Sequence, residues 1–303
     1  MSPAPRRSCG AMQVYEQLAE TYPAFRRNQE RINELTVRSI ASGEAQKVTR
    51  RLITIPVVVH VVYKRAAENI SKGQIRSQIK VLNRDFRATN PDRGNVPDPW
   101  KSLIGDAKIE FALARKDPRG RPTDGITRTE TELDAFSAAG DPVKKKSAGG
   151  VAAWPTNRYL NIWVCNLADG LLGYAQFPGG PARTDGVVIL YSAFGTEGAA
   201  RPPFNKGRTA THEIGHWLNL RHIWADTLGC GGTDHVVDTP NAAGPNYNKP
   251  SFPSISCQNG PNGDMFMNYM DYVDDAAMFM FTQGQVTRMN AALNGPRKKV
   301  AGL

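Results

Sequence analysis

The chain has 303 residues, of which 40% are hydrophobic and 22% charged, and its formal net charge is +10 at pH 7. This length can bury one large core or two modest ones, and no apolar run is long enough to span a membrane. Basic residues are scattered along the chain, and the run Lys144–Lys146 lacks aromatic interleaving, so we interpret it as a solvated loop. We therefore expect no membrane span and no nucleic-acid partner.

The first fifty residues are charged and carry only a sparse apolar set. Residues 11–46 predict helix, and Pro23 is expected to divide it in two. Residues 42–51 are polar and predict an exposed linker. Residues 1–8 lack the apolar core of a secretory signal, so the sequence leaves any export route open.

A region rich in strands follows. Ile53–Tyr63 is rich in Val and Ile and predicts a buried strand, with His60 packed in the core. Ser71 is a suitable N-cap for an amphipathic helix that runs to about Ala88. Cys165 lies within a strong strand pattern and is expected to be a buried free thiol. Further strands are expected at residues 107–114, 126–131, 159–167 and 187–191, and residues 170–178 predict an extended segment.

The chain changes character after residue 222. From 225 to 267, Gly, Pro, Asn and Asp dominate and regular periodicity disappears. A final helix is expected over residues 282–293. Strands and a helix followed by an irregular half indicate an α+β fold with its site in a cleft.

Two histidines lie four residues apart in a predicted helix, and a third follows. Helical spacing places His212 and His216 on one face, one turn apart. His222 can join them only if the chain bends after Leu218, and Asn219 tolerates the left-handed backbone of such a bend. Three neutral imidazoles suit zinc, with water in the open fourth position.

Glu213 lies beside this face, where it can reach a water between the ligands. It would take a proton from that water and pass it to a leaving amine. The alternative is a helix whose histidines merely pack or face solvent. That alternative is disfavoured because the chain has only five histidines and three of them fall in this stretch.

These residues, followed by Met270 in the segment 267–272, resemble the metzincin zinc peptidases. The resemblance covers about residues 53–293, and a propeptide-like piece precedes it. Asn219 departs from the family consensus, which has Gly at the bend. Three short segments are similar to the pappalysin branch and its compact ulilysin-like members: Asn-Ile-Trp-Val-Cys (161–165), His-Ile-Trp (222–224) and Asp-Thr-Pro (238–240).

The resemblance implies a metzincin-like catalytic domain. Its fold would be a twisted mixed sheet with backing and active-site helices, above an irregular lower subdomain with a C-terminal helix. The implied organisation is a propeptide of residues 1–50 and a catalytic domain of residues 51–303. The upper subdomain would span about 51–222 and the lower about 223–303.

The resemblance also implies roles for residues after the zinc motif. Met270 would form a hydrophobic base under the zinc, and Tyr272 would steady the tetrahedral intermediate. Asp275, with Asp274 beside it, falls where metzincins build the pocket for the residue after the scissile bond. An acidic floor would select Arg, and less well Lys, because a carboxylate holds a guanidinium bidentately. The alternative is that both aspartates face solvent or cap a turn.

Cys9 in Arg7-Ser8-Cys9-Gly10 is similar to the cysteine switch of this family's propeptides, where a thiolate fills the open zinc position. We expect Arg6 and Arg7 to lower the pKa of that thiol. The alternative is an unpaired surface cysteine. With an acidic pocket, the linker would offer cleavage sites at Thr49–Arg50 and Arg50–Arg51.

Four cysteines allow three pairings if all are bridged, and the sequence does not choose among them. The family has a disulfide at the places of Cys230 and Cys257. Its calcium-stabilised loop matches Asp234, Asp238 and Thr239, whose oxygen atoms suit that cation. On residues alone, this cluster reads as a solvated acidic turn.

We interpret the chain as an extracellular zinc endopeptidase, made as a zymogen, that cuts peptides or proteins on the N-terminal side of Arg. Two alternatives are a non-catalytic binding module with zinc and a zinc amidase for a non-protein substrate. Glu213 disfavours the first, because a structural zinc site needs no base. The extended segment Leu171–Ala175 disfavours the second, because an exposed strand can pair with a peptide backbone. Oligomeric state is left open.

Overall fold

A computed structural model describes residues 5–48 and 51–303, and its centre is a mixed sheet of six strands. Each strand expected from the sequence is present and falls within its predicted range. The strands are β1 Ile53–Tyr63, β2 Ile109–Leu113, β3 Ile126–Glu130, β4 Leu160–Cys165, β5 Gly173–Ala175 and β6 Val187–Leu190.

The strand order is β2-β1-β4-β6-β5, and β3 pairs with the second half of β1. All pairs are parallel except β5 with β6. Parallel strands are covered on both faces, which explains why β1 and β4 are mostly apolar rather than alternating. The antiparallel strand β5 lies at the edge of the sheet, where it can pair with another segment of extended chain.

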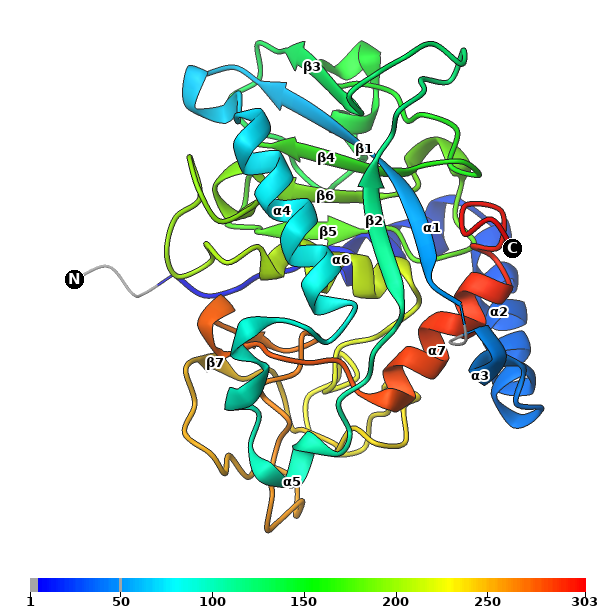
Figure 1. Cartoon of the computed structure of the whole chain (residues 1–303), viewed down its shortest axis with the longest axis vertical. Helices are drawn as coiled ribbons and strands as arrows, with labels where there is room; N and C mark the ends of the chain where they lie inside the picture. The colour runs from blue at the N-terminus through cyan, green and yellow to red at the C-terminus, as the bar shows by residue number, and fades with distance from the viewer. Residues whose placement is uncertain (1–4, 49–50) are drawn as a thin grey trace.

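Two helices cover one face of this sheet (Figure 1). Helix α4, Lys72–Asp85, begins as predicted at Ser71, whose hydroxyl accepts a hydrogen bond from Gln74 N at 3.0 Å. It ends three residues earlier than predicted, because Ala88 has a positive φ of 49°. Helix α6, Arg208–Trp217, lies beside α4 and carries the first two zinc-motif histidines.

The opposite face of the sheet is covered by loops that include Lys144. This lysine is buried, so the prediction of a solvated run is wrong for it. Its Nζ lies 3.0 Å from Asp141 Oδ1 and donates to Thr184 O at 2.8 Å. It also faces the rings of Trp163 and Tyr174. The ion pair and the hydrogen bond to the carbonyl therefore compensate for burying the Lys144 ammonium group, which the sequence alone predicts to be in solvent.

The half of the chain after residue 222 is irregular, as predicted. Cys230 and Cys257 form a disulfide that closes a loop of 27 residues. The final helix, α7 Gln283–Asn294, begins at Thr282, whose hydroxyl accepts from Gln285 N in a capping box. Short elements outside the main sheet are helix α5 Asp98–Lys101 and strands β7 Tyr247–Asn248 and β8 Tyr272–Val273.

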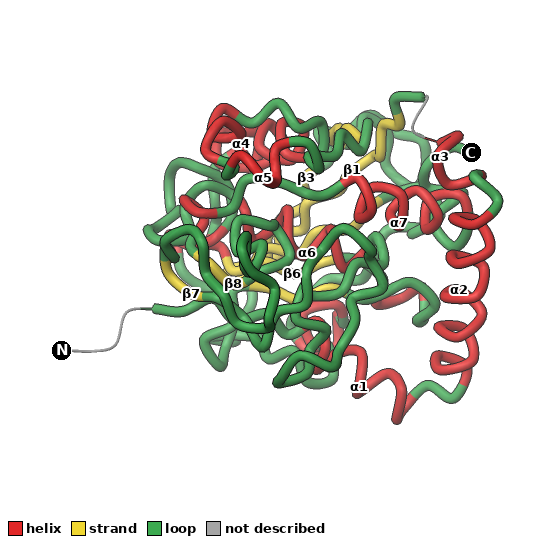
Figure 2. The backbone as a smooth tube through the Cα atoms, turned by 90° about the horizontal axis from the view of Figure 1, so that it is seen from below, coloured by secondary structure: helices red, strands yellow, loops and turns green. Residues whose placement is uncertain are grey.

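The N-terminal segment forms three helices, of which two were predicted. Helix α1, Ala11–Thr21, and helix α2, Ala24–Ala41, flank Pro23 as expected. Helix α3, Glu44–Val48, replaces half of the predicted linker and packs with α2 against α7 (Figure 2). The linker prediction is wrong there, because Ala45 is buried. The expected cleavage sites at residues 49–50 lie outside the described residues.

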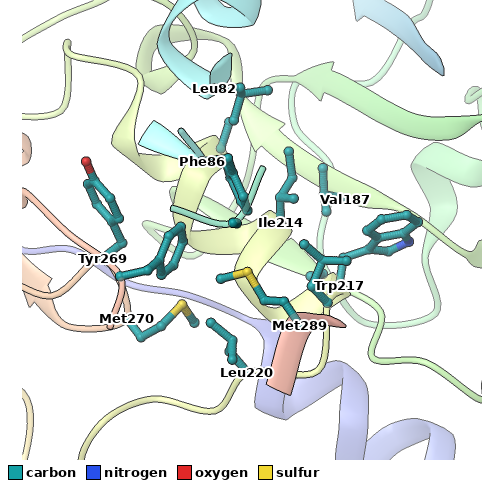
Figure 3. Packing of buried hydrophobic residues seen from close by; sticks show 14 of the residues in the cluster. Leu82, Phe86, Val187, Ile214, Trp217, Leu220, Tyr269, Met270 and Met289 are labelled. Atoms are coloured by element: carbon teal, nitrogen blue, oxygen red, sulfur yellow. The ribbon is translucent and has the colours of Figure 1, made fainter. Parts of the chain in front are cut away.

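Hydrophobic side chains from the sheet, α4, α6 and the C-terminal part form one core (Figure 3). Within it, Met270 and Leu220 lie close to Ile214 and Trp217 of α6. Both halves of the chain therefore share one core around the zinc helix. No helix among the described residues is both long and apolar enough to cross a bilayer.

Candidate active site

The three histidines of the motif meet in the structure. The Nε2 atoms of His212, His216 and His222 lie 3.1–3.2 Å apart, and all three side chains are buried. Three imidazole nitrogens bound tetrahedrally at the usual Zn–N distance stand about 3.3 Å from one another. The donor set and its spacing therefore fit zinc.

Each of these rings has its other nitrogen fixed by an acceptor. Nδ1 of His212 contacts the carbonyl of Tyr269 at 2.7 Å, and Nδ1 of His216 contacts the carbonyl of Leu220 at 2.8 Å. Nδ1 of His222 is hydrogen-bonded to the Asp226 carboxylate. An acceptor at Nδ1 requires the proton there, so each Nε2 presents its lone pair to the metal.

Burial sets the protonation of the centre. It lowers the pKa of His212 well below its usual range and that of His216 to about 3, and the neighbouring imidazoles add to both effects. Both rings are therefore neutral at physiological pH, as metal ligands must be. Burial also raises the pKa of Glu213 to about 8, against the opposing effects of the Cys9 hydrogen bond and the charge of Arg7.

The left-handed bend brings the third histidine back, as predicted. Asn219 has a φ of 73°, and the backbone reverses directly after α6. His222 then stacks on Trp224, with ring centroids 4.3 Å apart. The ring of Tyr272 lies 4.9 Å from that of His222 and 5.8 Å from that of His212.

Met270 lies under the helix that carries the first two ligands. Its sulfur approaches Gly215 so closely that a Cβ at that position would overlap it. Gly215, which separates Glu213 from His216 in the motif, is thus required by this methionine. Asn268 Oδ1 accepts from Met270 N at 2.9 Å, which fixes the turn.

Cys9 completes the cluster of ligand atoms. Its sulfur and the three imidazoles lie within 4.8 Å of one another, and this is the only such group found among the described residues. Its Sγ is also 3.3 Å from Glu213 Oε2. The expectation that Arg6 and Arg7 lower the pKa of this thiol is wrong. Burial and the charge of Glu213 raise it. Arg6 instead faces the ring of Tyr247, and Arg7 contacts Asp275.

Arg7 lies in a buried pocket two residues before Cys9. Its Nη2 donates to Asp275 Oδ1 at 2.6 Å, its Nη1 to Thr209 Oγ1 at 3.1 Å and its Nε to Val273 O at 3.1 Å. The guanidinium also faces the ring of Phe204. Asp275 is fully buried, and its other oxygen accepts from the amides of residues 206 and 208.

Asp274 does not share that pocket contact. Its amide donates to Asn248 O at 2.8 Å, and the residue directly precedes the short turn over residues 275–277. Of the two adjacent aspartates, Asp275 is therefore the one that meets the guanidinium.

The segment around Cys9 pairs with the edge strand β5 in parallel. Leu172 N donates to Ser8 O at 3.0 Å, and Gly10 N donates to Gly173 O at 2.9 Å. Arg7 therefore lies on one side of the histidine cluster, and helix α1 follows on the other.

The residues expected to bind calcium divide into two groups. Asp234 accepts from Thr239 Oγ1 at 2.7 Å and from Val236 N at 3.0 Å. Asp238 instead accepts from Thr282 Oγ1 and Gly284 N, so it caps α7. Burial raises the pKa of Asp234 to about 6.

Sequence reasoning missed three members of this site. No role at the zinc site was predicted for Asp226, although an acid four residues after a metal-binding histidine can reach its Nδ1. Arg7 was considered only for its effect on Cys9. Trp224 served only as part of a family signature, and no spacing rule predicts that it stacks on His222.

Comparison with known proteins identifies the family. The model of peptidase family M43, described as pregnancy-associated plasma protein-A, matches residues 146–294. Mature mirolysin of Tannerella forsythia, solved with a cleaved peptide, is 56% identical with a TM-score of 0.82, over 83% of this chain and 96% of that one. The chain belongs to the pappalysin family, M43.

Two further relatives extend this similarity over nearly the whole chain. A promirolysin mutant of Tannerella forsythia is 49% identical with a TM-score of 0.85, covering 97% of each chain. An extracellular metalloprotease of Podospora anserina is 31% identical over 301 residues, 96% of this chain and 90% of that one. The protein is a zinc metalloendopeptidase made as a zymogen, rather than the binding module or amidase considered as alternatives.

The geometry of His222 leads to a prediction about Asp226. Asp226→Ala should weaken zinc binding about 10- to 100-fold, as expected when a metal ligand loses its outer partner. Competition with a chromophoric chelator measures this affinity. Asp226→Asn keeps an acceptor without the charge and should lose less, whereas equal losses in both variants would contradict the role of the hydrogen bond.

Proposed function

We propose that this zinc endopeptidase cuts peptide bonds on the N-terminal side of arginine and that Asp275 selects this residue. The contact between Arg7 and Asp275 is the observation that carries the proposal. A guanidinium already satisfies the carboxylate, a hydroxyl, a carbonyl and an aromatic face of this pocket. A lysine would offer fewer donors in a less fixed arrangement and should bind less well.

In the proposed mechanism, Glu213 is the general base and then the general acid. It takes a proton from the attacking water and delivers it to the leaving amine. Tyr272 donates a hydrogen bond to the substrate oxygen that gains charge during attack. His212, His216 and His222 would hold the zinc ion, which would supply Lewis-acid activation of the substrate carbonyl and the water.

We further propose that residues 1–50 are the propeptide and that Cys9 is its latency ligand. The parallel pairing of this segment with β5 supports the proposal. An extended substrate that pairs antiparallel to β5 would run in the opposite direction, so the segment can fill the pocket and the metal position without presenting a cleavable bond. The same pairing supports β5 as the edge that binds substrate. Cleavage is proposed at Thr49–Arg50 or Arg50–Arg51.

The proposed place of action is outside the cell. The Podospora anserina relative is an extracellular metalloprotease, and this chain contains a disulfide, which persists in oxidising compartments. Peptides or proteins are the proposed substrates, as the cleaved peptide bound to mirolysin also suggests.

We also propose that calcium stabilises the loop around Asp234, Asp238 and Thr239. Asp234 is buried, and the charge of Arg288 acts on it, but no ion pair involving it is found in the part of the chain that the structure describes. A buried carboxylate without an ion-paired cation is unfavourable, and a bound calcium ion would provide that cation.

Replacing the pocket acid tests the specificity. Asp275→Asn keeps acceptors for the two amides but removes the charge, so a substrate guanidinium would be buried without its counter-ion. At about 3 kcal/mol, kcat/KM for peptides with Arg after the scissile bond should fall about 100-fold. Cleavage-site mapping by mass spectrometry measures the preference, and Asp274→Asn is the matched control. An arginine preference that survives in Asp275→Asn would refute the assignment.

Glu213→Ala should keep the fold and the bound zinc but lower kcat about 10²- to 10⁴-fold, the usual contribution of a positioned base. Metal analysis and peptide hydrolysis measure the two properties separately. A variant that cuts peptides at near the wild-type rate would show that another group is the base.

Cys9→Ala should convert to the mature form faster than the wild type, because the thiol no longer occupies the metal position. The time course of the new N-terminus, followed by sequencing, measures this rate. Cys165→Ala removes the other, fully buried free thiol and is the control. Equal rates for Cys9→Ala and the wild type would argue against latency through this thiol.

Removing calcium while retaining zinc should lower the melting temperature by several degrees. A bound ion at 100 times its Kd stabilises by about 2.7 kcal/mol, and that energy disappears with the ion. Calorimetry with a calcium-selective chelator measures the shift, and Asp234→Asn should abolish it. A melting temperature indifferent to calcium would remove this site from the proposal.

A further inference from the structure

The bend that follows α6 has the hydrogen bonds of a Schellman ending. Leu220 N donates to Gly215 O at 3.0 Å, and Asn219 N donates to His216 O at 2.9 Å. The left-handed position of this motif usually holds glycine. Here it holds Asn219, with a φ of 73° and a buried Nδ2 that has no hydrogen-bond partner among the described residues. The zinc bend therefore carries backbone strain and a polar atom that glycine would avoid.

A buried arginine from the C-terminal helix supports this bend. Arg288 of α7 is only 3% exposed, and its Nε donates to Asn219 O at 2.7 Å. Burying a guanidinium is costly unless it is hydrogen-bonded to an oxygen. Carbonyls just past a helix C-terminus carry partial negative charge and accept such a cation favourably. Arg288 therefore contacts the bend at the point where the backbone is strained and the carbonyls carry partial negative charge.

The carbonyl that Arg288 contacts is next in the chain to a carbonyl that orients a metal ligand. Asn219 O belongs to the peptide that joins Asn219 to Leu220, and the next carbonyl, Leu220 O, fixes the ring of His216. His222 follows two residues later. A change in the orientation of the first peptide would therefore turn the acceptor of one ligand and displace the other.

We propose that Arg288 is a positioning residue of the zinc site, which holds the strained bend at Asn219 in the conformation that His216 and His222 require. This inference rests on the zinc site itself and not on the proposed arginine specificity. The other hydrogen bond of Arg288 among the described residues is with the N-terminal segment, where its Nη2 donates to Asn33 Oδ1 of α2 at 3.1 Å. Its charge also acts on Asp234. Only the contact with Asn219 is assigned the positioning role.

Zinc affinity of the full-length protein tests this role directly. Arg288→Met keeps the length of the side chain but removes the donor. Its zinc affinity, measured by competition with a chromophoric chelator, should fall about 10-fold, the lower end of the range for outer partners of metal ligands. Adding Asn219→Gly to this variant should restore most of the affinity, because glycine adopts the left-handed bend without support.

Two controls separate positioning from general destabilisation. Asn33→Ala removes only the outer contact of Arg288 and should leave zinc affinity near that of the wild type. Denaturant unfolding of the zinc-free proteins reports any loss of stability that is independent of the metal. If Arg288→Met does not fold, Arg288→Lys replaces it, since it keeps the charge without the Nε donor. Wild-type zinc affinity in the Arg288 variant, or a loss that Asn219→Gly does not reverse, would overturn the proposal.

Discussion

The histidine cluster depends on one constraint, which is that three imidazole nitrogens must converge with their lone pairs directed inward. Their separations of 3.1–3.2 Å are possible because the Nδ1 atom of each ring is fixed by an acceptor. The acceptors come from three places: the segment before the methionine turn, the bend after α6 and the turn at Asp226. The metal centre therefore belongs to the tertiary structure, although a short motif supplies its ligands.

The irregular half of the chain, after residue 222, helps to hold the zinc ligands in this arrangement. Met270 packs under Gly215, and Tyr269 supplies the carbonyl that orients His212. These residues lie in a region without sustained helical or strand periodicity, yet they are fully buried. A disulfide and the capped helix α7 restrain a region that has little regular hydrogen bonding of its own. If this region lost its ordered structure, the zinc ligands would lose these contacts.

Buried cations connect distant parts of the chain around the zinc helix. Arg208 at the start of α6 pairs with Asp85 of α4 and with Asp92, and Arg297 near the C-terminus pairs with Asp185. Arg297 also donates to Trp217 O at the end of α6. Such pairs add little net stability compared with apolar packing, but removing one partner is costly, so they define the arrangement of the elements they join. The net charge of +10 gives no indication of these positions.

The sequence by itself determined the strands, the main helices, the zinc ligands and the bend, because each depends on local spacing. His212 and His216 share a helix face at any location in a fold, and Asn219 tolerates a left-handed backbone wherever it occurs. Only the tertiary structure decided that Lys144 is buried, that residues 44–48 pack against α7 and that Arg7 turns towards Asp275. Each of these depends on a partner far away in sequence, and neither residue periodicity nor composition records such a contact. The rise in the pKa of Cys9 has the same origin, since it comes from burial and from the charge of Glu213, a residue far away in sequence.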